Sequence, residues 1–194
     1  ELWNLDFSQA QDNLALARAE VAADARSVLA YDGTTDPYSW AMRRVARRLK
    51  EISDLFRTVY GDVAMMSTVR PVLAGQSANP YFVQTGLDMV NALYGEPSRY
   101  FHGTAGAPYF NLGNLQTAEG LGSSQVLERL QATAAAVPVE HQYEANLGVA
   151  RWYGLRFHVY EGGPDTFGPG SLDAKAAAHQ DGTMGTLCQS FLRD

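Results

Sequence analysis

The 194-residue chain is long enough for one domain with a real core, because 46% of its residues are hydrophobic and both charge signs are present. We therefore expect residues 1–194 to form a single domain. A formal net charge of −6 gives no general attraction to phosphate backbones or anionic lipids, so neither nucleic acid nor a membrane is an expected partner. Cys188 is the only cysteine, which excludes an intrachain disulfide and a zinc site built on several thiolates.

The sequence was also searched for a membrane span and for a signal peptide. No run of about 18 apolar residues could span a membrane, and the N-terminus lacks the basic, apolar, small-residue order of a signal peptide. The chain starts at Glu1 without a methionine, which suggests a processed or partial chain.

The first part of the chain is predicted to be helical. Residues 7–29 are rich in good helix formers and contain no Gly or Pro. Asp36 can cap the next helix, which Pro37 opens. In residues 39–60 apolar side chains recur every three or four positions and predict one buried face, formed by Met42, Val45, Leu49, Ile52, Phe56 and Val59.

The same segment carries a cluster of basic residues that could be taken for a nucleic-acid patch: Arg43, Arg44, Arg47, Arg48 and Lys50. They flank the apolar stripe and have Glu51 and Asp54 beside them, so a solvated outer helix face is the favoured interpretation.

Strands and helices then alternate. Residues 68–74 (TVRPVLA) suit a strand, Asn79-Pro80 opens a helix that runs to about Tyr94, and residues 99–102 suit a second strand. A glycine-dense segment from Gly103 to Gly122 is expected to be a functional loop.

In the last part, residues 123–136 and 139–153 are predicted helices, and residues 155–160 (LRFHVY) form the clearest strand. Residues 171–193 are predicted to be helical with a weak point around Gly182. Strands separated by helices imply an α/β fold with parallel pairing and helical crossovers.

In a parallel barrel, side chains that follow the strands form the active site, and here those are Gln76, His102 and Glu161. Glu161 stands between an apolar strand and Gly-Gly-Pro, where backbone room lies beside it; a capping or salt-bridging role is the structural alternative. Glu1 is a second acid, two residues before Trp3. His102 and His158 also fit structural, hydrogen-bonded histidines, and no histidine pair has helical metal-ligand spacing, so neither metal nor cofactor is expected.

Four short motifs resemble the clan A retaining glycoside hydrolases, which are (β/α)8 barrels. The opening ELWN looks like the end of the fourth barrel strand, which supplies the acid/base, and LRFHVYEGG looks like the seventh strand, which ends in the nucleophile. VRPVLAGQ and SRYFHGTAG stand in the places of the fifth and sixth strands. The resemblance is closest to large bacterial barrel proteins that often accompany cellulose-binding modules.

This resemblance implies a TIM barrel segment that runs from the end of the fourth strand through the seventh helix, with Glu1 as acid/base and Glu161 as nucleophile. Tyr100, His102 or Tyr109 would hydrogen-bond the nucleophile, Trp3 and Tyr109 would stack on sugar rings, and Gln76 and Asn79 would bind hydroxyls. The rest of the incomplete barrel would come from the same or another chain, and residues 1–194 alone would be inactive.

The function expected from the resemblance is a secreted, extracellular bacterial hydrolase that cleaves a plant or microbial polysaccharide or oligosaccharide by double displacement. Two alternatives stay open: a non-catalytic carbohydrate-binding or scaffold protein on a barrel fold, and a structural fragment that associates with a partner chain.

Overall fold

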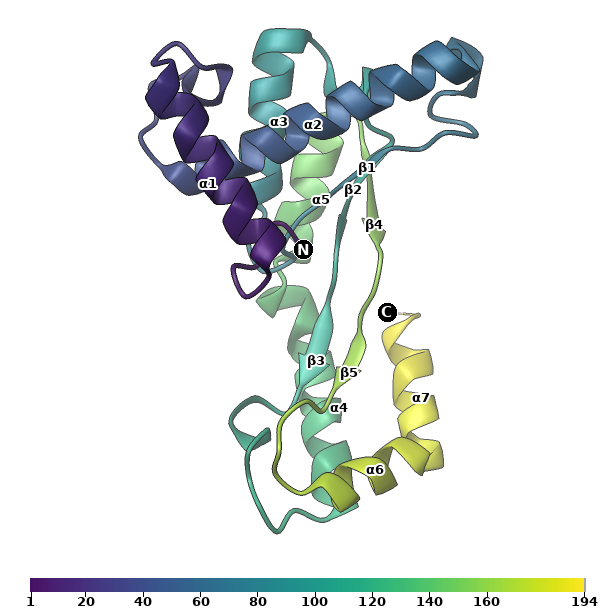
Figure 1. The fold of residues 1–194 in the computed structure, drawn as a ribbon. Helices are drawn as coiled ribbons and strands as arrows, with labels where there is room; N and C mark the ends of the chain where they lie inside the picture. Colours follow the sequence, from purple (N-terminus) through teal and green to yellow (C-terminus); the bar gives the residue numbers. More distant parts are fainter. Residues whose placement is uncertain (194) are drawn as a thin grey trace. The chain divides into compact units, whose positions relative to one another are not determined.

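The computed structural model of the protein describes residues 1–193, whose contacts form two compact units (Figure 1). The first unit comprises Glu1–Gly106 and Tyr143–His158, and the second comprises Ala107–Gln142 and the residues from Val159 onward.

Helices form most of the first unit: α1 (Ser8–Ala23), α2 (Pro37–Tyr60), α3 (Tyr81–Tyr94) and α5 (Tyr143–Trp152), with the short 3₁₀ turns η1 (Val28–Ala30), η2 (Asp62–Ala64) and η3 (Pro97–Arg99). α2 packs against both α1 and α3 (Figure 1). The helix expected over residues 7–29 ends early, at Ala23, because the next residue is extended and the Ser27 hydroxyl accepts from the Leu29 N–H to start η1.

The predicted helix over residues 39–60 is confirmed as α2, and so is its cap. The Asp36 carboxylate accepts from the N–H groups of Tyr38 (3.1 Å) and Ser39 (3.0 Å), which satisfies two donors that a helix start leaves unpaired. The apolar stripe is buried only in part. The buried residues of α2 all lie from Ser39 to Ser53. Phe56 and Val59 come after this stretch and are 42% and 72% exposed.

Arg43 contradicts the expectation of a solvated outer face on α2. Its side chain is 3% exposed, and both guanidinium Nη atoms contact the Asp32 carboxylate, at 2.8 and 2.5 Å. Arg43 also donates to the Leu29 carbonyl (2.8 Å) and the Thr85 hydroxyl (3.1 Å). A buried charge is tolerated when it is paired and hydrogen-bonded in this way, and the partners come from three other segments of the chain.

The first unit contains most of a three-stranded sheet with the order β1 (Val72–Ala74), β2 (Gly103–Gly106) and β4 (Arg156–Val159). β1 and β2 are parallel, with Val72 opposite Gly103 and Ala74 opposite Ala105. The strand predicted over residues 155–160 is confirmed as β4, whereas the one predicted at residues 99–102 is wrong. Pro97–Arg99 form η3 there, and β2 begins one residue after His102.

The second unit contains β3 (Tyr109–Asn111), β5 (Gly163–Asp165), η4 (Gly113–Leu115), α4 (Ser123–Glu140), α6 (Leu172–Gln180) and α7 (Gly182–Phe191). β3 and β5 are parallel, and α4 packs against β3, α6 and α7 (Figure 1). α4 runs through Pro138 to Glu140, although separate helices were expected on either side of that proline. The predicted weak point near Gly182 is confirmed, since α6 ends at Gln180 and Asp181 caps α7.

The α/β class with short parallel strands and helical connections is therefore confirmed. The glycine-dense segment expected to be a loop contains β2 and β3, so only part of it is irregular. Among residues 1–193, no helix is both long and apolar enough to cross a bilayer.

Candidate functional site

The carboxyl ends of β1 and β2 form a tightly packed edge of the sheet. An added Cβ at Gly75 would stand 2.3 Å from Val83 Cγ2, and one at Gly106 would stand 2.3 Å from Ser77 Oγ. A methyl group at either position would require the side chain of Val83 or Ser77 to move, so glycine allows the closest packing here. The chain that leaves β1 is thus held close to the end of β2.

Gln76 and Asn79 lie on the turn that leaves this edge. The Asn79 N–H donates to the Gln76 carbonyl (3.0 Å), and the Phe82 N–H donates to the Asn79 carbonyl (3.3 Å) at the start of α3. Gln76 is exposed and Asn79 is half-buried. Gln76 follows the carboxyl end of β1, as the sequence predicts, and Asn79 lies just before the start of α3. The role of the two amides with substrate hydroxyls stays a prediction.

Glu1 and Trp3 lie at the start of the chain, in the first unit. Glu1 is exposed, and its Oε2 accepts from Asn4 Nδ2 (3.0 Å) while its carbonyl accepts from the Asn4 N–H (3.1 Å). Trp3 is half-buried and packs against the hydrophobic core of the unit. The indole therefore has a packing role, besides any contact it makes with a ligand.

Tyr100 does not have the accessible hydroxyl that a substrate contact requires. It is 9% exposed, and its hydroxyl donates to the Tyr94 carbonyl (2.8 Å) inside the core of the first unit. Lys50 Nζ lies 5.1 Å from its ring centroid. Tyr100 directly follows the 3₁₀ turn η3 and belongs to the hydrophobic core of the unit, and the role expected for it beside the nucleophile stays a prediction.

His102 lies at the amino-terminal end of β2, opposite the end where a barrel would place its active site. Its ring stacks on His158 with centroids 5.4 Å apart, and its carbonyl accepts from the Arg156 N–H. Burial lowers the pKa of His102, and the positive charges of Arg70 and Arg156 lower it further. His102 was expected at the end of a strand over residues 99–102. It precedes β2 instead, because that strand begins at Gly103.

Glu161 belongs to the second unit and is exposed, two residues beyond the end of β4. An added Cβ at the next residue, Gly162, would stand 2.6 Å from the Pro108 carbonyl oxygen, so the segment after Glu161 runs directly against the start of β3. The pairing of Tyr109 with Gly163 continues this contact. Glu161 and Tyr109 therefore lie on adjacent segments of the second unit, and a hydrogen bond between their side chains stays a prediction.

Tyr109 is half-buried, and its carbonyl accepts from His141 Nε2 (2.9 Å). Of the eight residues expected at the site, Tyr109 and Glu161 lie in the second unit. The other six lie in the first unit, and they are Glu1, Trp3, Gln76, Asn79, Tyr100 and His102.

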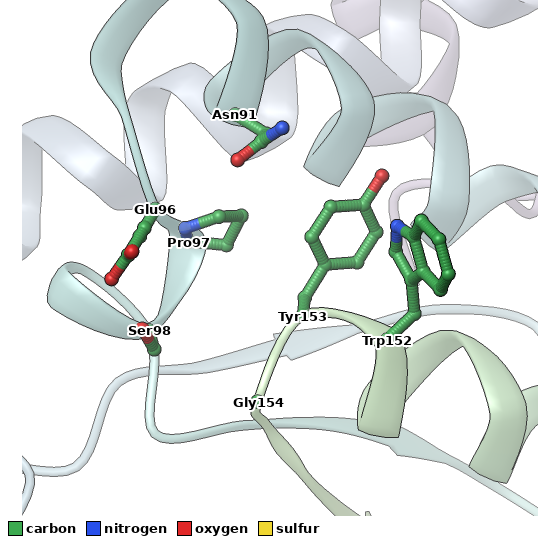
Figure 2. A pocket seen from close by; sticks show the side chains of 7 residues that line it. All are labelled: Asn91, Glu96, Pro97, Ser98, Trp152, Tyr153 and Gly154. Atoms are coloured by element: carbon green, nitrogen blue, oxygen red, sulfur yellow. The ribbon is translucent and has the colours of Figure 1, made fainter.

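The first unit contains a cavity of about 260 Å³ that was not predicted, and Figure 2 shows it from close by. Its lining residues are Asn91, Glu96, Pro97, Ser98, Trp152, Tyr153 and Gly154. The two contributing segments are more than fifty positions apart, so no local motif could reveal it. An exposed tryptophan at a predicted helix end was the one available signal.

Among residues 1–193, no three His, Cys, Asp or Glu side chains lie close enough together to hold a metal ion. No family model, curated protein or solved structure matches the chain.

Proposed function

We propose that the chain is part of the (β/α)8 barrel of a retaining glycoside hydrolase, with Glu161 as nucleophile and Glu1 as acid/base. The substrate in this proposal is a plant or microbial polysaccharide or oligosaccharide, and the enzyme is secreted by a bacterium. The proposal starts from the resemblance of four short motifs to clan A hydrolases and is supported by the topology of the sheet.

The order β1-β2-β4 is the observation that carries the proposal. Each of these strands lies within one of the motifs that resemble the fifth, sixth and seventh barrel strands, and the strands are hydrogen-bonded neighbours in that same order. α3 connects β1 to β2, and β3, α4 and α5 lie between β2 and β4, with β3 pairing with β5 outside this sheet. A barrel requires neighbouring strands to be joined by connections that contain a helix, and both of these connections do. An unrelated α/β protein could have placed the strands in another order.

The edge strands offer a second line of support. β4 has no neighbour beyond β2 among the described strands, and its Val159 is 53% exposed. An apolar side chain on an unpaired edge is a liability that proteins cover with another strand or element. A barrel completed by further strands, from the same or another chain, would cover this edge and the outer edge of β1.

The chemistry follows from the two carboxyl groups. In the first step Glu161 attacks the anomeric carbon, while protonated Glu1 gives its proton to the leaving oxygen. In the second step ionised Glu1 takes a proton from water, which attacks the same carbon and releases Glu161 from the sugar. This sequence requires the carboxyl groups to come within about 5–5.5 Å of each other in the complete barrel.

Replacement of Glu161 tests the proposal in the polypeptide that carries residues 1–194 with the rest of the barrel. Glu161→Gln keeps the size of an exposed side chain and should leave folding intact while turnover falls by orders of magnitude. A matched control is Glu119→Gln, which changes another glutamate of the same unit. Hydrolysis that survives Glu161→Gln would overturn the assignment.

The alternative is a non-catalytic carbohydrate-binding protein on the same fold. The buried Tyr100 and the displaced His102 favour it, because two of the groups expected to support the nucleophile lie elsewhere. It predicts saccharide affinity without turnover, unchanged in Glu1→Gln and Glu161→Gln, which calorimetry measures.

A further inference from the structure

The cavity in the first unit has one aromatic wall and one polar wall. Trp152 ends α5 and Tyr153 follows it, while Asn91 lies in α3 and Glu96, Pro97 and Ser98 lie in the turn after that helix (Figure 2). All seven lining residues belong to the first unit. The cavity therefore stands on contacts within a single compact unit.

Of the two aromatic side chains in the wall, Tyr153 is held by a hydrogen bond and Trp152 is exposed to solvent. The Tyr153 hydroxyl donates to the Asp88 carboxylate, and burial together with this hydrogen bond raises the pKa of Tyr153. Trp152 is 82% exposed, so a large apolar surface meets solvent at the mouth of the cavity. Covering an indole face with an apolar ligand surface is favourable, since tryptophan is among the strongest contributors to binding.

The polar wall supplies hydrogen-bonding groups. Asn91 offers an amide donor and acceptor, and Ser98 offers a hydroxyl. Glu96 offers a carboxylate, and its side chain makes no capping hydrogen bond to η3. Glu96 is the one charged residue among the seven that line the cavity, so an anionic ligand such as a phosphate would be repelled.

We propose that this cavity binds one neutral sugar ring. Such a ring has C–H groups that can cover the Trp152 indole and hydroxyls at its rim for Asn91, Glu96 and Ser98. A volume of about 260 Å³ lies just below the usual range of about 300–1,000 Å³ for ligand pockets, which suits a single ring better than a chain. The site lies at the amino-terminal ends of β2 and β4, because α3 with η3 precedes β2 and α5 precedes β4.

This position separates the site from the chemistry of the hydrolase proposal, which concerns residues after the carboxyl ends of the strands. The binding inference does not rest on hydrolysis. Glu161→Gln should abolish turnover in the complete enzyme and leave sugar binding at the cavity unchanged, so the two proposals can fail separately.

Saturation-transfer NMR and calorimetry on the full chain test the inference with methyl glucoside, methyl galactoside and xylose as probes. We expect saturable binding of at least one sugar in the millimolar range, as a ligand of this size allows. Trp152→Ala should weaken binding about tenfold or more, because it removes the stacking face. Asn91→Ala should weaken it by a smaller factor.

Phe167→Ala is the matched control, since it removes an aromatic ring that is 83% exposed in the other unit. Thermal unfolding of each variant checks that the fold persists. We expect Trp152→Ala to remain folded, because Trp152 is largely exposed and contributes little to the core. Tetramethylammonium is the competing probe, because two aromatic rings and a carboxylate could also hold a cation.

Binding of tetramethylammonium without sugar binding would overturn the inference in favour of a cation site. Absence of saturation with all three sugars would also overturn it, as would wild-type sugar affinity in Trp152→Ala. Sugar binding that is lost in Trp152→Ala and kept in Phe167→Ala supports it.

Discussion

The ion pair between Arg43 and Asp32 should contribute more to stability than any surface ion pair of α2. Arg43 is 3% exposed and Asp32 is 40% exposed, and the guanidinium also binds the Leu29 carbonyl. Removing one partner of a fully buried pair costs about 3–5 kcal/mol of unfolding free energy. Because solvent screens the half-open carboxylate, we expect about 1–3 kcal/mol of coupling here.

A double-mutant cycle measures this coupling. Unfolding by urea is followed for the wild type, Asp32→Asn, Arg43→Met and the double variant. Arg48 and Glu51 provide the matched control, since they form an ion pair on the same helix at 3.0 Å with side chains 64% and 45% exposed. Their coupling should be about 0.3–0.5 kcal/mol.

The same pair has a defined pH dependence. The hydrogen bond from Arg43 lowers the pKa of Asp32 to about 2, below its ordinary value of 3.8. The stabilising contribution is therefore complete above pH 3.8 and is lost as the pH falls toward 2. A coupling no larger than that of Arg48 with Glu51, or one unchanged at low pH, would show that burial of Arg43 does not strengthen its ion pair with Asp32.

Two further predictions concern packing and histidine ionisation. Gly86→Ala should lower the unfolding free energy by up to about 2 kcal/mol, because its Cβ would stand 2.8 Å from Ala46 Cβ and overpacking outweighs the helical gain. An added Cβ at Gly148 would have no neighbouring atom within 4 Å, so Gly148→Ala should raise the unfolding free energy by about 0.5–1 kcal/mol. Urea unfolding measures both variants, and changes of the same sign in the two would contradict the packing argument. His102 has a lowered pKa, so the unfolded chain takes up its proton first and stability should fall as the pH drops below about 6.5. Thermal unfolding at pH 7.5 and 5.5 should show a smaller loss for His102→Gln, and an equal loss would count against this.

Local sequence patterns were sufficient to predict those elements whose structure depends mainly on their own residues. The spacing of apolar residues and the Asp36-Pro37 cap predict α2, and LRFHVY predicts β4, because periodicity and β-branched or aromatic composition act over a few residues. β2 could not be predicted in this way. Its sequence is Gly-Thr-Ala-Gly, and it is a strand because β1 and β4 pair with it on both sides.

Long-range contacts explain the remaining errors. Arg43 looked like a solvated charge because its partner, Asp32, lies outside the helix. Tyr100 was expected within a strand over residues 99–102, because the sequence did not reveal that Pro97 starts a 3₁₀ turn. The expected positions of Gln76 and Glu161 after strands were correct, because the apolar segments that form β1 and β4 are recognisable in the sequence, whereas the position of His102 was wrong because β2 is not.

The most direct test of the hydrolase proposal is the capture of its covalent intermediate. The polypeptide that carries residues 1–194 with the rest of the barrel is incubated with 2-deoxy-2-fluoroglycosides, and the peptides are mapped by mass spectrometry. We expect a glycosyl ester on Glu161 and none in Glu161→Gln, because the fluorine slows release of the sugar from the nucleophile. Hydrolysis of the parent substrates with an ester on another carboxylate would contradict this expectation.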